Sequence, residues 1–151
     1  MLRDFEPRDQ DTVRGLIQSG MAERWGDQFD PDANSDTDDL WATYVARGAE
    51  IAVFEIDGDV VATGTLIPEA DGAGRIRRVS VDLRHRRKGL ARAVVSELIE
   101  RALRRDLDPL RVTADTPWTD AVQLYRACGF EIVSQNEVAT QFTMSPQHRR
   151  T

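Results

Sequence analysis

The sequence is poor in the residues that build disulfides and metal sites, with one cysteine and two histidines among 151 residues. Cys128 cannot form a disulfide within the chain, and two histidines do not provide the ligand spacing of a zinc site. No apolar run approaches the roughly 20 residues of a membrane-spanning helix, and the polar residues after Met1 do not resemble a signal peptide. We therefore expect a cytoplasmic protein without a metal or a membrane partner, and Cys128 as a small buried apolar residue.

The length and composition are those of a single globular domain. Hydrophobic residues make up 40% of the chain, which suits one core at this length. We expect the domain to cover residues 1–145 and residues 146–151 to form a frayed tail. The formal net charge is −6, and because an acidic surface repels nucleic acid, a nucleic-acid partner is not expected.

Positive charge is concentrated in one segment. Residues 75–88 contain seven arginine and lysine side chains against the single acid Asp82, a local charge of +6 that leaves −12 for the remainder of the chain. Such a region in an acidic protein focuses its field on a small anion, such as a polyphosphate. On charge alone, a solvated basic loop before a helix is the alternative.

Hydrophobic periodicity and turn residues predict the order of the secondary structure. The predicted strands cover residues 2–5, 51–56, 60–67, 75–81, 110–114, 130–134 and 138–144, and the predicted helices cover about residues 7–21, 40–45, 90–105 and 120–128. Asp-Gly at residues 57–58 predicts a hairpin between the second and third strands. Ser35 or Thr37 is the expected N-cap of the second helix, and Gly48 its stop. This order predicts a mixed α/β fold, whose exposed strand edges would allow a homodimer.

The run Arg86-Arg87-Lys88-Gly89-Leu90-Ala91 lies between the strand predicted to end at Val81 and the long helix that follows. Backbone N–H groups at a helix N-terminus lack intrahelical partners and bind phosphate oxygens without a specific side chain. Gly89 has no Cβ and can adopt a left-handed conformation, and the methyl group of Ala91 barely obstructs a ligand. The run therefore predicts a phosphate-binding cradle at the start of the helix.

This run, with the preceding strand Val79-Ser80-Val81, resembles the acetyl-CoA motif Arg/Gln-x-x-Gly-x-Gly/Ala of the GCN5-related N-acetyltransferases. The segment from Ala121 to Phe130 is similar to the Ala-x-x-Leu-Tyr-x-x-x-Gly-Phe segment that this family carries after its fifth strand. The two motifs occur in the family's order, within a matching order of elements from Leu2 to Met144. The resemblance implies one acetyltransferase domain with a largely antiparallel, twisted sheet flanked by about four helices.

The resemblance also implies an activity, the transfer of an acetyl group from acetyl-CoA as cosubstrate to a small-molecule or peptide amine by direct attack. It implies that the backbone amides of residues 87–92 hold the pyrophosphate of CoA. The pantetheine arm would pair with residues 79–81 as an added strand would. The cofactor-binding residues implied in this way are Val79, Ser80, Val81, Arg86, Arg87, Lys88, Gly89, Leu90, Ala91 and Arg92.

Tyr125 matches the tyrosine of the family that is implied to protonate the departing CoA thiolate. A phenol ordinarily remains a protonated donor at neutral pH, as this role requires. The alternative is an aromatic packing residue on a short amphipathic helix.

The sequence departs from the family pattern at two places. Many members carry a glutamate near the start of the strand before the cradle, whereas residues 75–78 here read Arg-Ile-Arg-Arg, and arginine cannot accept a proton. The candidate bases that stay open are Glu23, Glu55, Glu69 and Asp115. Trp118 stands where the family often has an asparagine that bonds the pantetheine arm. The indole N–H of Trp118 can donate a hydrogen bond but cannot accept one. The alternative role for Trp118 is packing at the helix start.

The sequence is compatible with two kinds of acceptor. In this family the acceptor lies against the loop between the first two helices, where acids and aromatic rings at Trp25, Phe29 and Asp30 would attract a cationic amine. Arg75, Arg77 and Arg78 would instead favour a substrate that bears a carboxylate.

Two alternatives to an enzyme follow from the same residues. The missing strand glutamate and Trp118 would suit a catalytically inactive acyl-CoA-binding module. A nucleic-acid-binding protein that uses residues 84–88 is the third class, which the acidic remainder of the chain disfavours.

Overall fold

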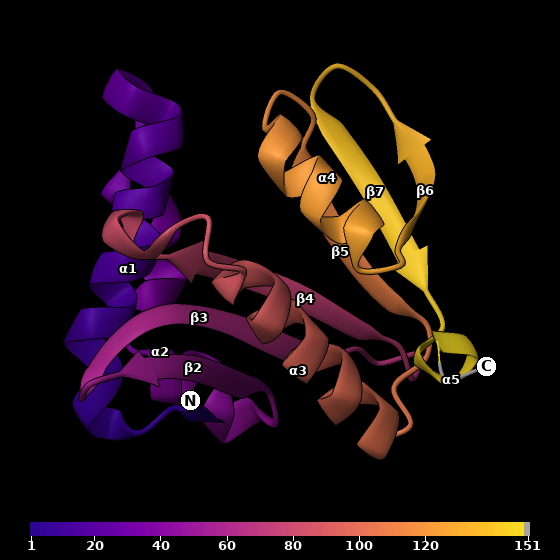
Figure 1. The fold of residues 1–151 in the computed structure, drawn as a ribbon, viewed down its shortest axis with the longest axis horizontal. Helices are drawn as coiled ribbons and strands as arrows, with labels where there is room; N and C mark the ends of the chain where they lie inside the picture. Colours follow the sequence, from indigo (N-terminus) through magenta and orange to yellow (C-terminus); the bar gives the residue numbers. More distant parts are fainter. Residues whose placement is uncertain (150–151) are drawn as a thin grey trace.

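The computed structural model describes residues 1–149, which form one seven-stranded sheet with the order β1-β2-β3-β4-β5-β7-β6 (Figure 1). The strands are β1 (Leu2–Asp4), β2 (Glu50–Ile56), β3 (Asp59–Pro68), β4 (Gly74–Val81), β5 (Leu110–Asp115), β6 (Glu131–Gln135) and β7 (Ala139–Met144). Every neighbouring pair is antiparallel except β4 and β5, which are parallel. The mixed, largely antiparallel sheet predicted above is confirmed.

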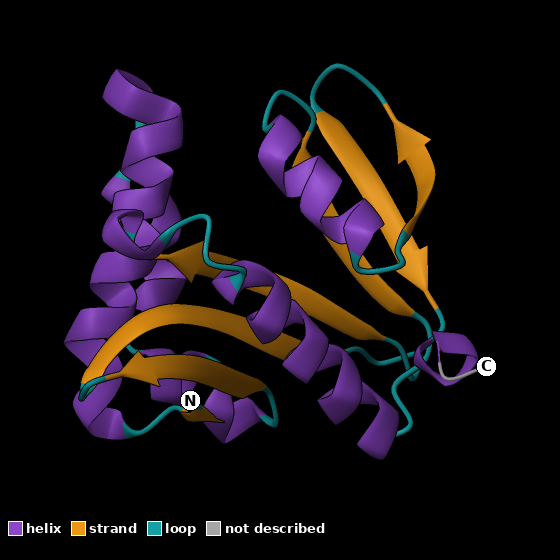
Figure 2. Ribbon diagram, viewed as in Figure 1, coloured by secondary structure: helices purple, strands orange, loops and turns teal. Residues whose placement is uncertain are grey.

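Helices cover both faces of this sheet (Figure 2). The α-helices are α1 (Gln10–Trp25), α2 (Leu40–Thr43), α3 (Leu90–Arg104), α4 (Thr119–Ala127) and α5 (Pro146–Arg149), and the 3-10 helices are η1 (Pro7–Asp9), η2 (Gly26–Gln28), η3 (Pro31–Thr37), η4 (Val45–Arg47) and η5 (Leu83–His85). One hydrophobic core lies between the sheet and the pair α3 and α4, and a second lies between β2 and the pair α1 and α2.

Helix α3 packs on β3 through the apolar stripe that its sequence predicts. Val94 and Leu98 are fully buried, as the spacing of four residues requires for one helix face. Gly64 of β3 lies beneath them, and a Cβ added there would come within 2.7 Å of the Val94 side chain. The absence of a side chain at residue 64 thus sets how closely α3 approaches the sheet.

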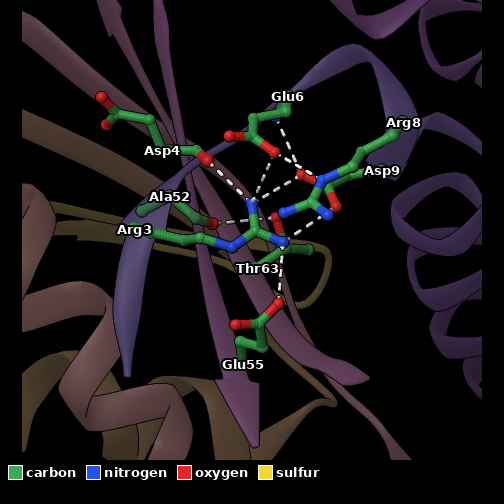
Figure 3. A network of polar contacts seen from close by, with 8 residues as sticks. All are labelled: Arg3, Asp4, Glu6, Arg8, Asp9, Ala52, Glu55 and Thr63. Carbon is green, nitrogen blue, oxygen red and sulfur yellow. Dashed lines mark hydrogen bonds and ion pairs between the residues drawn. The ribbon is translucent and has the colours of Figure 1, made fainter. Parts of the chain in front are cut away.

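An ion pair joins the first strand to the start of α1 (Figure 3). Arg3 donates two hydrogen bonds, of 2.8 and 3.0 Å, to the carboxylate of Asp9, and a third, of 3.2 Å, to Glu55. Asp9 also accepts a hydrogen bond of 2.8 Å from the backbone N–H of Glu6, which closes a capping box around η1. Asp9 is only 5% exposed, and the hydrogen bonds from Arg3 hold its pKa below the usual range.

The second helix differs from the prediction. Instead of one helix over residues 40–45, the chain forms a single turn of α2 followed by η4, which ends at a left-handed Gly48 as predicted. Ser35 and Thr37 do not cap α2, because both lie inside η3; the cap is Asp39, whose carboxylate accepts from the backbone N–H of Ala42. The helix is interrupted at Tyr44, whose φ of −114° departs from the helical value; the ring of Tyr44 is buried and its hydroxyl donates a hydrogen bond to Asp36.

The remaining predictions concern the C-terminal tail, the edge of the sheet and membrane-spanning helices. The frayed tail expected over residues 146–151 includes the α5 turn, and residues 150–151 lie outside the described part of the chain. Strand β6 forms one edge of the sheet, and all five of its residues are exposed. A homodimer through such an edge stays a prediction. None of the helices in residues 1–149 is long and apolar enough to span a bilayer.

Replacing Asp9 by asparagine should lower the free energy of unfolding at neutral pH by about 2 kcal/mol, because Arg3 loses the carboxylate to which it donates two hydrogen bonds. Since the pKa of Asp9 is lowered by folding, its contribution is present above the unfolded-state pKa and is lost as the pH falls through the folded-state pKa. Urea unfolding at a series of pH values should therefore show the gap between wild type and Asp9→Asn closing towards acid. The exposed Asp27→Asn is the control with little effect, and a gap that does not change with pH would contradict this account.

Candidate active site

Strands β4 and β5 pair at only two positions and then diverge. Their register holds Gly74 opposite Leu110 and Arg75 opposite Arg111, after which the β5-facing edge of β4 has no strand partner (Figure 1). A cleft of about 910 Å³ opens at this divergence, between β4 and β5 and under the ends of α1, α3 and α4. Its volume lies in the range of roughly 300–1,000 Å³ that is common for small-molecule sites.

Strand β4 contains a bulge at the point where it leaves β5 behind. Thr63 of β3 pairs with Ser80 and Thr65 with Arg77, so β4 contains one residue more than β3 over this stretch. Arg78 lies in this bulge with a left-handed φ of 57°. A bulge bends the strand and increases its local twist, which turns the end of β4 away from β5.

The side chain of Arg78 holds this strained backbone in place. Its guanidinium donates two hydrogen bonds, of 3.0 and 2.6 Å, to Asp36 and one of 2.9 Å to the side chain of Asn34. Burial alone would raise the pKa of Asp36, but hydrogen bonds from Tyr44 and Arg78 outweigh burial and lower it. The ionised carboxylate therefore ties β4 to η3, across the space beside the cleft.

The predicted cradle forms the turn between β4 and α3. Arg87 and Gly89 both have positive φ angles, of 64° and 77°, and α3 begins directly after Gly89 without a side-chain cap. Left-handed residues in such a turn direct neighbouring backbone N–H groups into a shared concavity that suits an anion. A Cβ added to Gly89 would meet no atom within 4 Å, so the space in front of its backbone is open.

Most residues singled out by the sequence lie on this cleft. The predicted cofactor-binding residues that line it are Val79, Ser80, Val81, Arg86, Arg87, Gly89, Leu90, Ala91 and Arg92, and Tyr125 and Trp118 line it as well. Lys88 is exposed and does not line the cleft. The sequence reasoning missed the wall made by α1, which consists of Ile17, Gly20, Met21 and Arg24. Their spacing of three, four and seven residues marks one helix face, but spacing alone does not indicate that this face borders the cleft.

Tyr125 lies on α4 with its ring in the core and its edge on the cleft. The ring makes tilted contacts with Phe130 and Phe142, with centroids 5.8 and 5.7 Å away. Tyr125 is only 7% exposed, and burial raises the pKa of its hydroxyl. The phenol is therefore a protonated hydrogen-bond donor throughout the neutral range. Cys128, one turn further on, is buried as expected.

The end of α1 contacts both sides of the cleft. Arg24 forms an ion pair of 3.0 Å with Asp120 and lies 4.4 Å from the centre of the Trp118 ring, which also contacts Trp25 edge-on. Trp118 is the N-cap residue of α4, so the structure gives it the packing contacts considered above. On the cradle side, Arg86 donates two hydrogen bonds, of 2.6 and 2.7 Å, to Glu23.

Three of the four candidate bases are held in ion pairs. Glu23 is paired with Arg86, which lowers its pKa, while Glu55 is bonded to Arg3 and Glu69 accepts from Arg75 and Arg111. The fourth, Asp115, forms no ion pair among the described residues. It follows the cleft-lining Ala114, and burial raises its pKa.

Arginines far outnumber acidic side chains in the lining of the cleft. Its charged lining consists of Arg24, Arg75, Arg77, Arg78, Arg86, Arg87 and Arg92 against the single carboxylate of Asp120. Across the described residues, no group of three or more histidine, cysteine or acidic side chains is gathered as a metal site would require. The arrangement therefore suits an elongated anionic ligand, with an open strand edge along its middle and a turn rich in backbone N–H groups at one end.

Comparisons with known proteins agree with this geometry. The model of the acetyltransferase (GNAT) family matches residues 17–130. A GNAT-family acetyltransferase of Staphylococcus aureus Mu50 superimposes with a TM-score of 0.86 at 13% sequence identity, over 97% of this chain and 98% of that one. Among curated proteins, no sequence matches the chain.

Two further solved structures share the fold. The Salmonella typhimurium protein yncA, determined with its cofactor acetyl-CoA, has a TM-score of 0.81 and 20% identity over 97% of this chain and 93% of its own. The ribosomal-protein-alanine N-acetyltransferase of Brucella melitensis has a TM-score of 0.76 and 18% identity, over 96% of this chain and 99% of its own. At these identities the likeness concerns the fold.

Replacing Arg78 by alanine should lower the free energy of unfolding by about 3 kcal/mol, because the half-buried carboxylate of Asp36 loses its cationic partner. Arg77→Ala removes the neighbouring arginine, which makes no ion pair with any described residue, and should cost less than about 0.5 kcal/mol. Urea unfolding of the two variants measures the difference, and equal losses would show that the contacts of Arg78 do not hold the bulge.

Proposed function

The chain belongs to the GNAT family of acetyltransferases, whose model matches residues 17–130, and from this premise we propose that it transfers the acetyl group of acetyl-CoA to a primary amine. The observation that carries the proposal is the cleft between β4 and β5, which has an open strand edge and ends at the turn of residues 86–89. A thioester with a long amide-containing arm and a pyrophosphate fits this combination of features.

The residues around the cleft suit acetyl-CoA at both ends. Backbone N–H groups of residues 87–92 would hold the pyrophosphate at the positive end of α3. Arg87 lines the cleft and makes no ion pair with any described residue, so its guanidinium is available to a phosphate oxygen. The free edge of β4 at Val79–Val81 would pair with the amides of the pantetheine arm as a neighbouring strand does.

In the proposed reaction the nitrogen of a neutral amine attacks the thioester carbonyl carbon. A carbon–nitrogen bond forms, the carbon–sulfur bond breaks, and the sulfur receives a proton from the Tyr125 hydroxyl. A backbone N–H of β4 would stabilise the negative charge that develops on the carbonyl oxygen. The amine proton would pass to Asp115, directly or through one water, since the other three candidate carboxylates are held in ion pairs.

A catalytically inactive acyl-CoA-binding module is the second candidate function. The observation that favours it is the absence of Glu23, Glu55, Glu69 and Asp115 from the residues that line the cleft. Such a module would bind acetyl-CoA through the same cradle and release no thiol when amines are added.

Two measurements on the full chain test the proposal. Saturating acetyl-CoA at about 100 times its Kd should raise the free energy of unfolding by about 2.7 kcal/mol. Release of free CoA thiol should then depend on the added amine. Stabilisation without thiol release for any amine of a broad panel would support the binding module, and the absence of stabilisation would overturn both functions.

Replacing Gly89 by alanine should weaken acetyl-CoA binding by about tenfold or more, because a left-handed φ is strained for alanine and the new methyl group enters the open space. Lys88→Ala is the matched control on the preceding residue. It should change the Kd by less than about threefold, since an exposed charge contributes little. Titration calorimetry measures both Kd values. A larger effect of Lys88→Ala than of Gly89→Ala would show that the turn acts only as a basic loop.

Replacing Tyr125 by phenylalanine should lower kcat by about a hundredfold, the usual contribution of a general acid. The Kd for acetyl-CoA and the melting temperature should stay close to those of wild type, because the aromatic packing is retained. Thiol release at saturating acetyl-CoA measures this. Unchanged turnover with intact binding would leave Tyr125 as a packing residue only.

A further inference from the structure

The aspartate-rich segment of residues 27–39 does not make the cleft acidic. None of its six aspartates lines the cleft, and four of them serve the local structure. Asp30 and Asp39 cap short helices, Asp36 holds the bulge of β4, and Asp38 forms an ion pair of 3.3 Å with Arg14. Trp25, Phe29 and Asp30, considered above as a site for a cationic amine, do not line the cleft either.

Arginines dominate the lining instead, and two of them make no hydrogen bond or ion pair with any described residue, although the charge of Arg77 acts on Asp36 and helps to lower its pKa. Arg24, Arg75, Arg78, Arg86 and Arg92 each bond to a carboxylate or to a backbone carbonyl. The remaining two are Arg87, in the cradle turn, and Arg77, on β4 at the position before the bulge. The two arginines that make no hydrogen bond therefore lie on two different elements of the cleft wall.

The side chain of Arg77 lies on the face of the sheet opposite α3. Its neighbour Ile76 is buried in the core beneath α3, and successive side chains of a strand point to opposite faces. Arg77 is exposed and lines the cleft from the face that α1 covers. Arg87, by contrast, adjoins the start of α3, where the proposed pyrophosphate site lies.

We propose that the acceptor amine also carries a carboxylate, as a free amino acid does, and that Arg77 is the specificity-determining residue that binds this carboxylate. The proposal rests on the acetyltransferase function proposed above. A guanidinium whose N–H groups make no hydrogen bond within the described residues can present a two-pronged hydrogen bond to a carboxylate. The arginines of the cleft that make no ion pair would repel a polyamine, which carries only positive charge, and would attract an acceptor with an anionic group.

Matched acceptors test the charge requirement directly. Leucine, phenylalanine and histidine are each compared with their primary amides and with isopentylamine, phenethylamine and histamine, the amines without the carboxylate. Spermidine and a short peptide with a free N-terminus and an amidated C-terminus complete the set. Initial rates of thiol release are expressed per concentration of unprotonated amine, because the members of each triplet differ in amine pKa. We expect the amino acids to have the highest kcat/KM.

Two variants separate the role of Arg77 from general charge effects. Arg77→Gln should raise KM for the amino acids by about 10- to 100-fold, the range for loss of a charged hydrogen bond, with kcat and the rates of the amides changed less than about threefold. Arg77→Lys keeps the charge and should recover part of the loss. Arg126→Gln makes the same charge change at an exposed residue of α4 outside the cleft and should leave KM unchanged.

The outcomes distinguish this inference from the function on which it rests. Higher kcat/KM for the decarboxylated amines, spermidine or the peptide would overturn the carboxylate site while supporting the acetyltransferase. An equal KM effect of Arg77→Gln on amino acids and amides would also overturn it. If acetyl-CoA neither stabilises the chain nor supports thiol release with any acceptor, the proposed function itself is wrong.

Discussion

The divergence of β4 from β5 after two residue pairs is the constraint on which the rest of the structure depends. A parallel pair would normally continue along both strands and close the sheet at this point. Instead, the extra residue at Arg78 turns the end of β4 aside and leaves its edge without a partner. Backbone N–H and C=O groups in that position must find another partner. The strained, left-handed Arg78 is therefore part of the distortion that leaves this edge open for the extended ligand proposed above.

The arginines at the cleft fall into two groups, those that form ion pairs and those that do not. Most of those at the cleft are neutralised by carboxylates on neighbouring elements, and the resulting ion pairs position α1, β4 and the cradle turn relative to one another. Arg86 with Glu23, and Arg78 with Asp36, are examples. The few that remain unpaired give the cleft its free positive charge. An acidic protein can in this way bind an anionic ligand without an extended basic surface.

The sequence predicts those parts of the fold that local pattern determines. The strands and α3 are predictable because apolar residues repeat every two or four positions, and the turn before α3 because Gly89 precedes a helix. The bulge at Arg78 could not be predicted, since arginine gives no sign of a positive φ and the carboxylate that holds it lies 42 residues earlier in the chain. The role of the aspartates as caps and ion-pair partners, and the contribution of α1 to the cleft, likewise depend on tertiary contacts. Periodicity indicated the helix but not its neighbours.

The most direct test of the account is a titration of isotope-labelled protein with CoA, followed by the amide chemical shifts of each residue. The account predicts the largest changes in the free edge of β4 at residues 79–81 and in the turn and first helical residues 87–92. Small changes there, with large ones confined to another surface such as β6, would contradict the claim that the diverging strands and the cradle form one cofactor site.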